Sequence, residues 1–348
     1  MELIAVGPAA REAWLEALAT DPAALVSQTP AWLDCVCASG RYEDATRVYR
    51  AGDGRQLILP LARWRRSPSA ASVEGSMPYG WGTGGIVCSG GSLTAADVAA
   101  VSAELGARRA LRVAIRPSPA ADSAWRAGVP GTAVRLSHMS QTIDLAGGFE
   151  YVSAHRFSSR VRRACRKAQR RQVTVESDAT GRLIDVFDAL YRKSVVRWAE
   201  QQHEPLRLAQ WRANARDPRH KFETVARRLG PACRVWVAWR DSAPAAAIIV
   251  LSHGVHSTYW RGAMDRDVAA GSGANELLHW RAIEDACASG ARFYHMGEAA
   301  PSSSLAHFKL GFGAVEQQHT GYRFERVPLT AADAFVRRQV KRVLRFRD

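Results

Sequence analysis

The feature that most constrains the fold is an order of predicted elements that occurs twice along the chain. In the second half, three segments rich in β-branched and aromatic residues are separated by short turn signals, which predicts successive antiparallel strands. A helix follows, because apolar residues from Leu277 to Cys287 recur at helical spacing and Gly290 can end it. In chain order we expect strands at 233–240, 245–252 and 255–262, a helix at 274–290, a strand at 291–298, a short helix ending at Gly313 and a strand at 315–327.

The first half repeats this order with a weaker pattern. A hairpin is expected at 46–64 about an Ala-Gly-Asp-Gly turn. The other elements expected there are a strand within 75–88, a helix at 93–107, a strand at 111–117, a short helix at 120–127 and a strand at 134–145. The copies are separated by roughly 180 residues, which is the size of a domain and not of a solenoid repeat. We therefore predict an α/β (α+β) fold of two similar domains, 1–145 and 146–348, with a helical insertion at about 150–230.

The composition is that of a folded, water-soluble protein. Of the 348 residues, 47% are hydrophobic and 23% are charged, which argues against wholesale disorder. No apolar stretch approaches the roughly 18 residues of a membrane span, and the segment MELIAVGPAAREAW lacks the regions of a signal peptide, so we expect a cytoplasmic protein. The six cysteines lack paired CxxC spacing, so we expect reduced core residues and no metal site.

An unbalanced positive charge points to a polyanionic partner. Lys and Arg number 48 against 33 Asp and Glu, which gives a net charge of +15. The densest run is HRFSSRVRRACRKAQRRQ at 155–172, which holds eight Arg or Lys residues and no acid. Apolar residues at helical spacing, among them Phe157, Val161 and Cys165, would anchor one side of this helix. Its cations then lack local partners, so phosphates are the expected counter-ions, with a solvated basic face or an acidic membrane as alternatives.

The C-terminal segment AADAFVRRQVKRVLRFRD has a similar character. Six Arg or Lys residues, from Arg337 to Arg347, accompany an apolar line of Phe335, Val340 and Leu344. Such a segment could contact RNA or lie on a membrane surface, and the residues leave both readings open.

The segment 257–280 carries residues suited to binding an anion. An aromatic and cationic strand end, Tyr259-Trp260-Arg261, leads into a turn at the start of a helix, where backbone N–H groups are free to bind. The glycines of that turn, Gly271 and Gly273, equally suit an ordinary turn and helix cap.

The segment 295–313 carries residues suited to catalysis. A strand ends at Glu298, a Ser-rich loop follows, and Lys309 stands beside Phe308 in a short helix. A lysine held next to an aromatic ring could stabilise a developing oxyanion or a phosphate, although it could also be an ordinary surface lysine.

These segments, the two-fold repeat and the closing GYRFERVPL resemble the Fem family. The resemblance covers most of 140–345 and, more weakly, the first half; its most specific element is Phe308-Lys309 followed by Gly311-Phe312-Gly313. Fem proteins are aminoacyl-tRNA-dependent transferases. Their two tandem acyltransferase-like (GNAT) domains each hold a mixed, mostly antiparallel sheet flanked by helices, and some members have a tRNA-contacting helical insertion.

The resemblance implies an enzyme that moves an amino acid from the ester of a charged tRNA to an acceptor amine. Lys309 would lie by the reacting ester as an electrostatic stabiliser with Phe308 beside it, and charged tRNA would be a co-substrate with no further cofactor. We expect a monomer. The expected contacts are Tyr259, Trp260, Arg261 and Asn275 for substrate, Tyr79 and Trp81 in the loop 75–85 for the acceptor, and Arg160, Arg163, Arg166, Lys167 and Arg170 for tRNA.

An aminoacyl ester is already activated, so the enzyme mainly aligns the amine with the carbonyl and stabilises the oxyanion. The amine must still lose a proton. Glu298, His256, His307 and Asp265 are candidate acceptors, and their spacing does not choose among them, although we include Glu298 with Lys309 and Phe308 as the predicted catalytic set. The leaving ribose hydroxyl or a substrate phosphate could serve instead.

Two other readings compete with this one. GNAT domains usually bind coenzyme A through a Gln/Arg-x-x-Gly-x-Gly/Ala loop, and an acyl-CoA-dependent N-acyltransferase is weakened here because Val268 stands three residues before Gly271. A non-catalytic RNA- or membrane-binding protein is the second. As acceptor, a small peptide of the kind used in antibiotic biosynthesis is favoured over a peptidoglycan precursor, because the first-half loops lack a long basic run for a diphosphate carrier.

Overall fold

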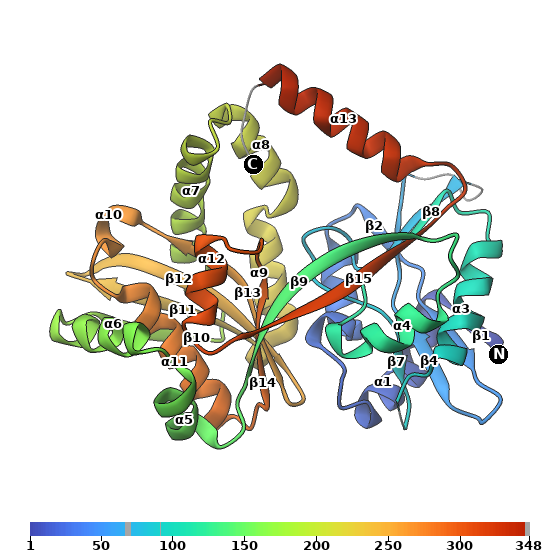
Figure 1. Cartoon of the computed structure of the whole chain (residues 1–348), viewed down its shortest axis with the longest axis horizontal. Helices are drawn as coiled ribbons and strands as arrows, with labels where there is room; N and C mark the ends of the chain where they lie inside the picture. The colour runs from blue at the N-terminus through green and yellow to red at the C-terminus, as the bar shows by residue number, and fades with distance from the viewer. Residues whose placement is uncertain (67–70, 91, 345–348) are drawn as a thin grey trace. The chain divides into compact units, whose positions relative to one another are not determined.

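The computed structural model describes residues 1–66, 71–90 and 92–344, and the chain divides into two compact units (Figure 1). The first unit comprises residues 1–138 and 318–340, and the second comprises residues 139–317 with the C-terminal residues from 341. The chain passes from the first unit to the second within β9 (Val134–Asp144) and returns within β15 (Val315–Glu325).

This division differs from the predicted boundary between 145 and 146. The second part of β15 pairs antiparallel with β8 (Arg112–Ile115), with Tyr322 opposite Ile115. Tyr322 stacks on Trp125 and, with Phe324, packs in the core of the first unit. Burial of these rings attaches the returning strand to the first unit, whereas a boundary read along the sequence assigns it to the second domain.

Two sheets and the helices beside them form the first unit. One sheet has the order β1-β3-β4-β7, and the other runs from the second part of β15 through β8, β6 and β5 to β2. The predicted hairpin, helices and long strand are confirmed, while β1, α1 and α2 lie where no element is predicted. The elements are β1 (Glu2–Val6), α1 (Arg11–Thr20), α2 (Pro30–Ala38), β2 (Tyr42–Asp44), β3 (Arg47–Arg50), β4 (Gln56–Leu59), β5 (Ala62–Trp64), β6 (Val73–Ser76), β7 (Val87–Cys88), α3 (Ala95–Ala107) and α4 (Asp122–Gly128).

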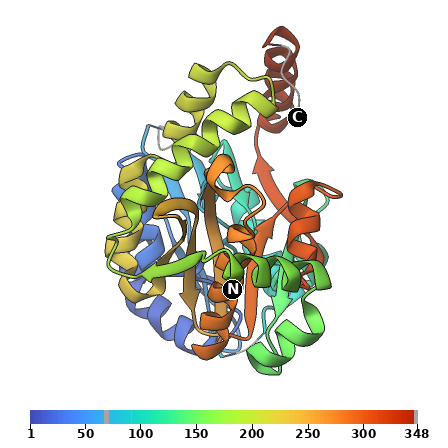
Figure 2. The ribbon, with the colours of Figure 1, turned by 90° about the vertical axis from the view of Figure 1, so that its left-hand side faces the viewer.

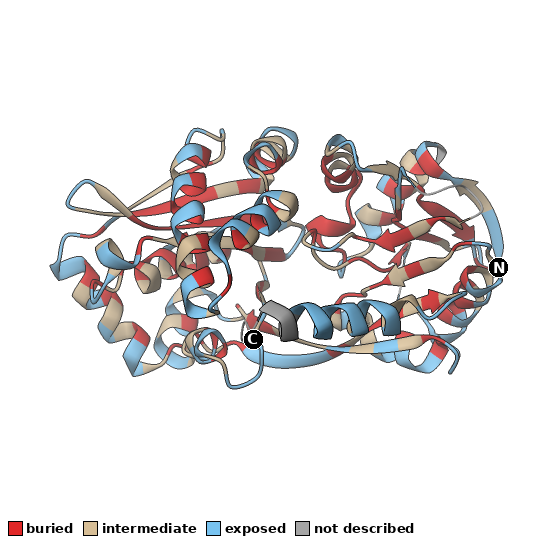
Figure 3. Cartoon of the chain, turned by 90° about the horizontal axis from the view of Figure 1, so that it is seen from above, coloured by how far each residue is buried: buried red, intermediate tan, exposed pale blue. Residues whose placement is uncertain are grey.

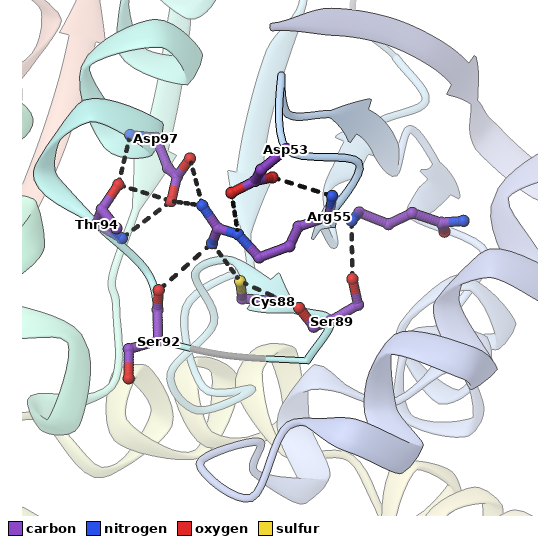
Figure 4. A network of polar contacts seen from close by, with 8 residues as sticks. Asp53, Arg55, Cys88, Ser89, Ser92, Thr94 and Asp97 are labelled. Carbon is purple, nitrogen blue, oxygen red and sulfur yellow. Dashed lines mark hydrogen bonds and ion pairs between the residues drawn. The ribbon is translucent and has the colours of Figure 1, made fainter.

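A polar network joins the hairpin turn of this unit to the start of α3 (Figure 4). Arg55 Nε donates to Asp53 Oδ2 over 2.7 Å, and Arg55 Nη2 donates to Asp97 Oδ2 over 3.1 Å. Asp97 also forms a capping box with Thr94. The turn and the helix therefore hold each other in place through one arginine.

The second unit contains a sheet of order β10-β11-β12-β13-β14-β9, to which β9 contributes its second part. Adjacent strands in this sheet pair antiparallel, except β13 and β14, which pair parallel. The predicted strands and helices from 233 onward are confirmed, and β10 is a strand inside the stretch predicted to be helical. The elements are α5 (Gly148–Tyr151), α6 (Ser159–Arg170), β10 (Thr174–Asp178), α7 (Ile184–Gln201), α8 (Leu206–Arg216), α9 (Arg219–Leu229), β11 (Cys233–Arg240), β12 (Ala243–His253), β13 (His256–Met264), α10 (Arg266–Ala269), α11 (Ala274–Ala288), β14 (Phe293–Glu298) and α12 (Ser304–Leu310).

Helices cover both faces of this second sheet. Ala246, Ile248 and Val250 of β12 share a core with α6 and α11. Because side chains alternate along a strand, Ala247 and Ile249 point to the opposite face, which α7 and α9 cover. In Figures 1 and 2, α7 and α8 (yellow-green) are drawn toward the top of this unit and α6 (green) toward its bottom. Among the described residues, no helix combines the length and apolarity that crossing a bilayer requires.

Candidate functional site

A pocket of about 510 Å³ lies in the second unit, where β13 ends and α11 begins. The parallel pairing of β13 with β14 runs only from His256 to Thr258, so the pocket lies just beyond the point where these strands separate. Three of the predicted site residues, Tyr259, Asn275 and Phe308, meet in its wall. The lining residues are Arg197, Trp198, Gln201, Tyr259, Gly262, Ala263, Met264, Arg266, Asn275, His279, Ser304, Leu305 and Phe308.

A β-bulge in β13 sends neighbouring residues to different faces of the sheet. Tyr259 pairs with Val250 and Arg261 pairs with Ile249, so Trp260 is an extra residue between consecutive partners. Tyr259 therefore faces α11, whereas Trp260 and Arg261 both face the helices on the other side.

The prediction that Trp260 and Arg261 contact substrate is accordingly corrected. Arg261 Nη2 donates to Asp217 Oδ1 over 3.0 Å, and Lys221 Nζ donates to the same oxygen over 2.8 Å. The Trp260 ring packs against Phe222 and below the Lys221 ammonium. Burial alone would raise the pKa of Asp217, but the charges of Arg261 and Lys221 outweigh it and hold the pKa well below its usual range. These residues form a buried ion-pair cluster that ties β13 to the α8–α9 junction.

His279 is a pocket residue that is not among the predicted site residues. It is 1% exposed, and its ring packs edge-on against Tyr259, at 4.8 Å between ring centroids, and near Phe308. Its Nδ1 is buried without a hydrogen-bond partner, and Nε2 has none within the described part of the chain. Burial, and secondarily the charge of Lys309, lower the pKa of His279 to about 3, so the ring is neutral at physiological pH.

The conformation of this wall depends on glycine. A Cβ placed on Gly262 would come within 2.1 Å of Tyr259 Oη, so a side chain at 262 would displace the tyrosine. Burial raises the pKa of Tyr259 to about 12, which keeps its hydroxyl protonated beside the pocket.

Lys309 follows Phe308 in the chain and is not itself among the residues that line the pocket. Its side chain is 1% exposed, and Nζ donates to the backbone carbonyl of Glu298 over 2.9 Å. Burial lowers the pKa of Lys309 to about 8, against the opposing attraction of the Glu298 charge. Lys309 is thus joined to Glu298 through a backbone carbonyl, and the catalytic role predicted for Lys309, Phe308 and Glu298 stays a prediction.

The pocket has a positive wall. Arg197 Nη1 donates to the Met264 carbonyl over 3.3 Å, and burial followed by the charge of Arg266 lowers the pKa of Arg197. The neighbouring acid, Asp265, forms an ion pair with Lys193 over 2.5 Å. Of the described residues that line the pocket, none is aspartate or glutamate. Such a wall suits a neutral or anionic ligand.

The basic helix α6 is anchored as its sequence predicts. Val161, Cys165 and Ala168 are buried in the core of the second unit. The cations on the remaining sides are exposed or half-buried, and within residues 1–66, 71–90 and 92–344 they form neither an ion pair nor a hydrogen bond. These cations are Arg160, Arg163, Arg166, Lys167 and Arg170.

The same helix packs against the loop that precedes α11. Arg171 Nη1 donates to the Gly271 carbonyl over 2.9 Å. A Cβ on Gly273 would come within 2.4 Å of the Ala164 carbonyl oxygen, so the helix approaches this loop as closely as only glycine allows. The ammonium of Lys167 lies near Gly271, which brings α6 cations to the N-terminal end of α11.

The predicted acceptor residues lie in the first unit and have different environments. Tyr79 is 80% exposed, and its contact with an acceptor stays a prediction. Trp81 is buried, packs edge-on against Trp32 at 5.5 Å between ring centroids, and its carbonyl accepts from Trp32 Nε1 over 2.9 Å. Trp81 therefore belongs to the core of its unit, and its predicted contact with the acceptor is corrected.

None of the four predicted proton acceptors lines the pocket. His256 shares a hydrogen bond with His295 over 3.0 Å, and Asp265 is engaged with its lysine. His307 and Glu298 have exposed side chains. His279 does have a signal in the sequence, because it is a polar residue on the apolar side of the predicted 274–290 helix. That signal could have identified it as a residue of the pocket wall.

Three solved structures share this architecture over nearly the whole chain. FemX is 13% identical, with 93% of this chain and 97% of that chain covered and a TM-score of 0.64. The C-terminal domain of a putative lysylphosphatidylglycerol synthetase from Agrobacterium fabrum is 14% identical, with 95% of both chains covered and a TM-score of 0.53. A tandem GNAT protein from the clavulanic acid biosynthesis pathway is 13% identical, with 94% of this chain and 98% of that chain covered and a TM-score of 0.50.

This chain has a tandem GNAT fold. Its residues 155–309 match the family model of the acetyltransferase (GNAT) domain, so the match contains the pocket, α6 and Lys309. The resemblance to Fem-type proteins is confirmed for the fold, and an acyltransferase fold supports a transferase activity. A search of curated proteins found no match to the tandem GNAT chain.

Proposed function

We propose that this tandem GNAT protein transfers an aminoacyl group from a charged tRNA to the amine of an acceptor. The observation that carries the proposal is a pocket whose described lining includes buried His279 and no carboxylate, with buried Lys309 next to the lining residue Phe308. The same unit holds a helix with five cations that form no ion pair or hydrogen bond with the residues that the structure describes. A small acyl group on a long polyanion would use both features, because the pocket fits the acyl end and the helix fits phosphates.

The basic helix supports recognition of the tRNA backbone. Its apolar stripe is buried, so the cations are held on a fixed surface. Lys167 and Arg171 place this surface next to the loop before α11. The first turns of α11 also line the pocket. Roughly four to six phosphate contacts would make binding steeply salt-dependent.

Lys309 and His279 would act on the ester carbonyl. The acceptor nitrogen attacks this carbon, a C–N bond forms, the C–O bond to the ribose breaks, and the ribose oxygen leaves with a proton that the amine loses. A buried N–H without an acceptor is rarer than an unused lone pair, which favours the His279 tautomer that carries its proton on Nε2. A neutral imidazole can then donate to the developing oxyanion while the Lys309 charge stabilises it.

The acceptor and the compartment belong to the same proposal. We favour a small peptide or antibiotic-type amine over a peptidoglycan precursor, and a reaction in the cytoplasm by a monomer that needs charged tRNA and no further cofactor. Tyr79 remains the acceptor-side candidate because its ring is exposed.

An acyl-CoA-dependent N-acyltransferase is a second candidate, favoured by the match of residues 155–309 to the GNAT domain model. The loop before α11 argues against it. Ser272 Oγ accepts from the Ala274 N–H over 3.1 Å, and Gly273 makes room for α6. The Gly-Ser-Gly sequence thus has a packing role without a pyrophosphate, and Val268 stands where the expected loop has Gln or Arg.

The test combines purified protein with bulk tRNA charged with labelled amino acids and with the dialysable amine fraction of a bacterial extract. We expect label to move from acid-precipitable RNA into soluble, alkali-stable amides, and pretreatment with ribonuclease to abolish this transfer. Parallel reactions replace charged tRNA by acetyl-CoA and follow thiol release. Ribonuclease-insensitive turnover that requires the acyl-CoA would overturn the proposal in favour of the second candidate.

A further inference from the structure

The helix α13 (Leu329–Leu344) stands out because most of its described length is exposed on every side. From residue 331 to 340, each residue except Ala334 is exposed, and Figure 3 draws this helix, which ends beside the C label, largely in pale blue. The exposed residues include large apolar ones: Phe335 is 56% exposed, Val336 57% and Val340 42%. An isolated helix of this length is marginal in water and is normally stabilised by packing its apolar side.

The described polar contacts that fix the helix to the first unit lie at its start. Arg112 Nη2 forms an ion pair with Asp333 over 2.9 Å, and the Thr330 N–H donates to Glu325 over 3.1 Å. Within the described chain, neither Arg337 nor Arg338 forms an ion pair. The start of the helix is therefore held while the exposed part presents its side chains outward.

Apolar and basic residues occupy opposite sides of α13. At 100° per residue, Phe335, Val336 and Val340 fall within one half of the helix, and Arg337 and Arg338 fall in the other. The sequence continues with Lys341, Arg342 and Val343, whose side chains lie outside the described part of the structure. Arg345 and Arg347 lie outside the described residues.

We propose that α13 is a docking helix for an anionic lipid bilayer. Its apolar side would enter the boundary between headgroups and acyl chains, and its arginines would contact lipid phosphates. Charge and shape favour this occupant over two others: RNA would leave Phe335 and Val336 in water, and a second copy of the helix would bring equal positive charges together. The proposal does not depend on the transfer reaction.

Vesicle sedimentation with the full chain tests it. We compare vesicles of phosphatidylcholine with vesicles of equal parts phosphatidylcholine and phosphatidylglycerol, and expect binding to the latter that weakens as salt is raised. The pair Phe335→Ser with Val336→Ser should lower the partition coefficient at least about tenfold. The pair Arg337→Glu with Arg338→Glu should lower it by about 25-fold or more, since each lost cation is worth about fivefold.

A matched control replaces exposed apolar residues elsewhere in the same unit. Val6→Ser with Leu15→Ser removes side chains that are 44% and 60% exposed and should leave vesicle binding unchanged. Circular dichroism before and after vesicle addition checks that each variant is folded. Equal vesicle binding by wild type and the Phe335/Val336 pair would overturn the proposal. A wild type that is dimeric without lipid, with a Phe335/Val336 variant that is monomeric, would also overturn it. So would an Arg337/Arg338 variant that no longer retains tRNA but still binds vesicles.

Discussion

Replacing Lys309 by methionine should separate stability from activity. The lysine is 1% exposed, and burial lowers its pKa from the ordinary 10.5 to about 8. At neutral pH the fold thus holds a charge at a cost of roughly 3 kcal/mol. Methionine has a similar length and leaves no large cavity. It loses one hydrogen bond to the Glu298 carbonyl, worth about 1.5–3 kcal/mol for a charged donor. The two effects nearly offset, so Lys309→Met should be as stable as wild type or slightly more stable.

The same pKa sets a pH dependence for this comparison. Between pH 8 and 10.5 the unfolded chain still holds the Lys309 proton that the folded chain has lost, so wild-type stability rises with pH through this window. Methionine does not titrate. Any stability advantage of the variant should therefore be largest below pH 8 and should fall as pH approaches 10.5. Lys221, whose pKa burial also lowers to about 8, is present in both proteins and cancels from the difference.

Urea denaturation followed by circular dichroism at pH 7 and pH 10 measures the stability difference, and the charged-tRNA assay measures turnover. We expect kcat to fall by about 10²–10³ while the KM for charged tRNA changes little, because Lys309 would act on the developing oxyanion. A loss of more than about 3 kcal/mol at pH 7 would contradict the cost assigned to the buried charge. Unchanged turnover in a folded variant would remove Lys309 from the proposed mechanism.

Three further predictions address the cluster, the helix and the pocket. Asp217→Asn should lower the free energy of unfolding, measured in urea, by about 3–5 kcal/mol, because Arg216, Lys221 and Arg261 lose their buried counter-ion. A loss below about 1 kcal/mol would mean that water screens the charges of the cluster. Arg163→Glu with Lys167→Glu should raise the KM for charged tRNA at least about tenfold and flatten the salt dependence of binding, measured by filter retention; an unchanged KM would place tRNA elsewhere. His279→Phe keeps the aromatic packing and removes the donor, so kcat should fall about 10²-fold, with His279→Gln less affected, and wild-type turnover of the phenylalanine variant would exclude donation by this ring.

Regular elements were predictable wherever the local pattern was strong. The strands from 233 to 264 follow from segments rich in β-branched and aromatic residues between turn signals, and helix α11 follows from the period-3.6 spacing of its apolar residues. The strand β10 was not predictable in this way. It pairs with β11 through Thr174 opposite Trp239, a partner more than sixty residues away, and its own residues are mostly half-exposed. An edge strand of that kind owes its conformation to its neighbour.

The candidate site was predictable in part. Phe308, Asn275 and Tyr259 meet in one pocket as expected. The separation of Tyr259 from Trp260 and Arg261 was not predictable, because a bulge depends on the register against β12 and leaves no clear mark in β13 itself.

Taken alone, the amino-acid order determines the two-fold arrangement of elements, the excess of cations on α6 and the amphipathic character of the C-terminal helix. These are local properties, since charge and apolar spacing act over a few residues. Only the tertiary structure decides that Arg197, from the helical insertion, lines the same pocket as His279 and Phe308, and that Asp217 takes Arg261 away from it. Such groupings depend on strand register and helix packing, which arise from contacts between residues far apart in the chain.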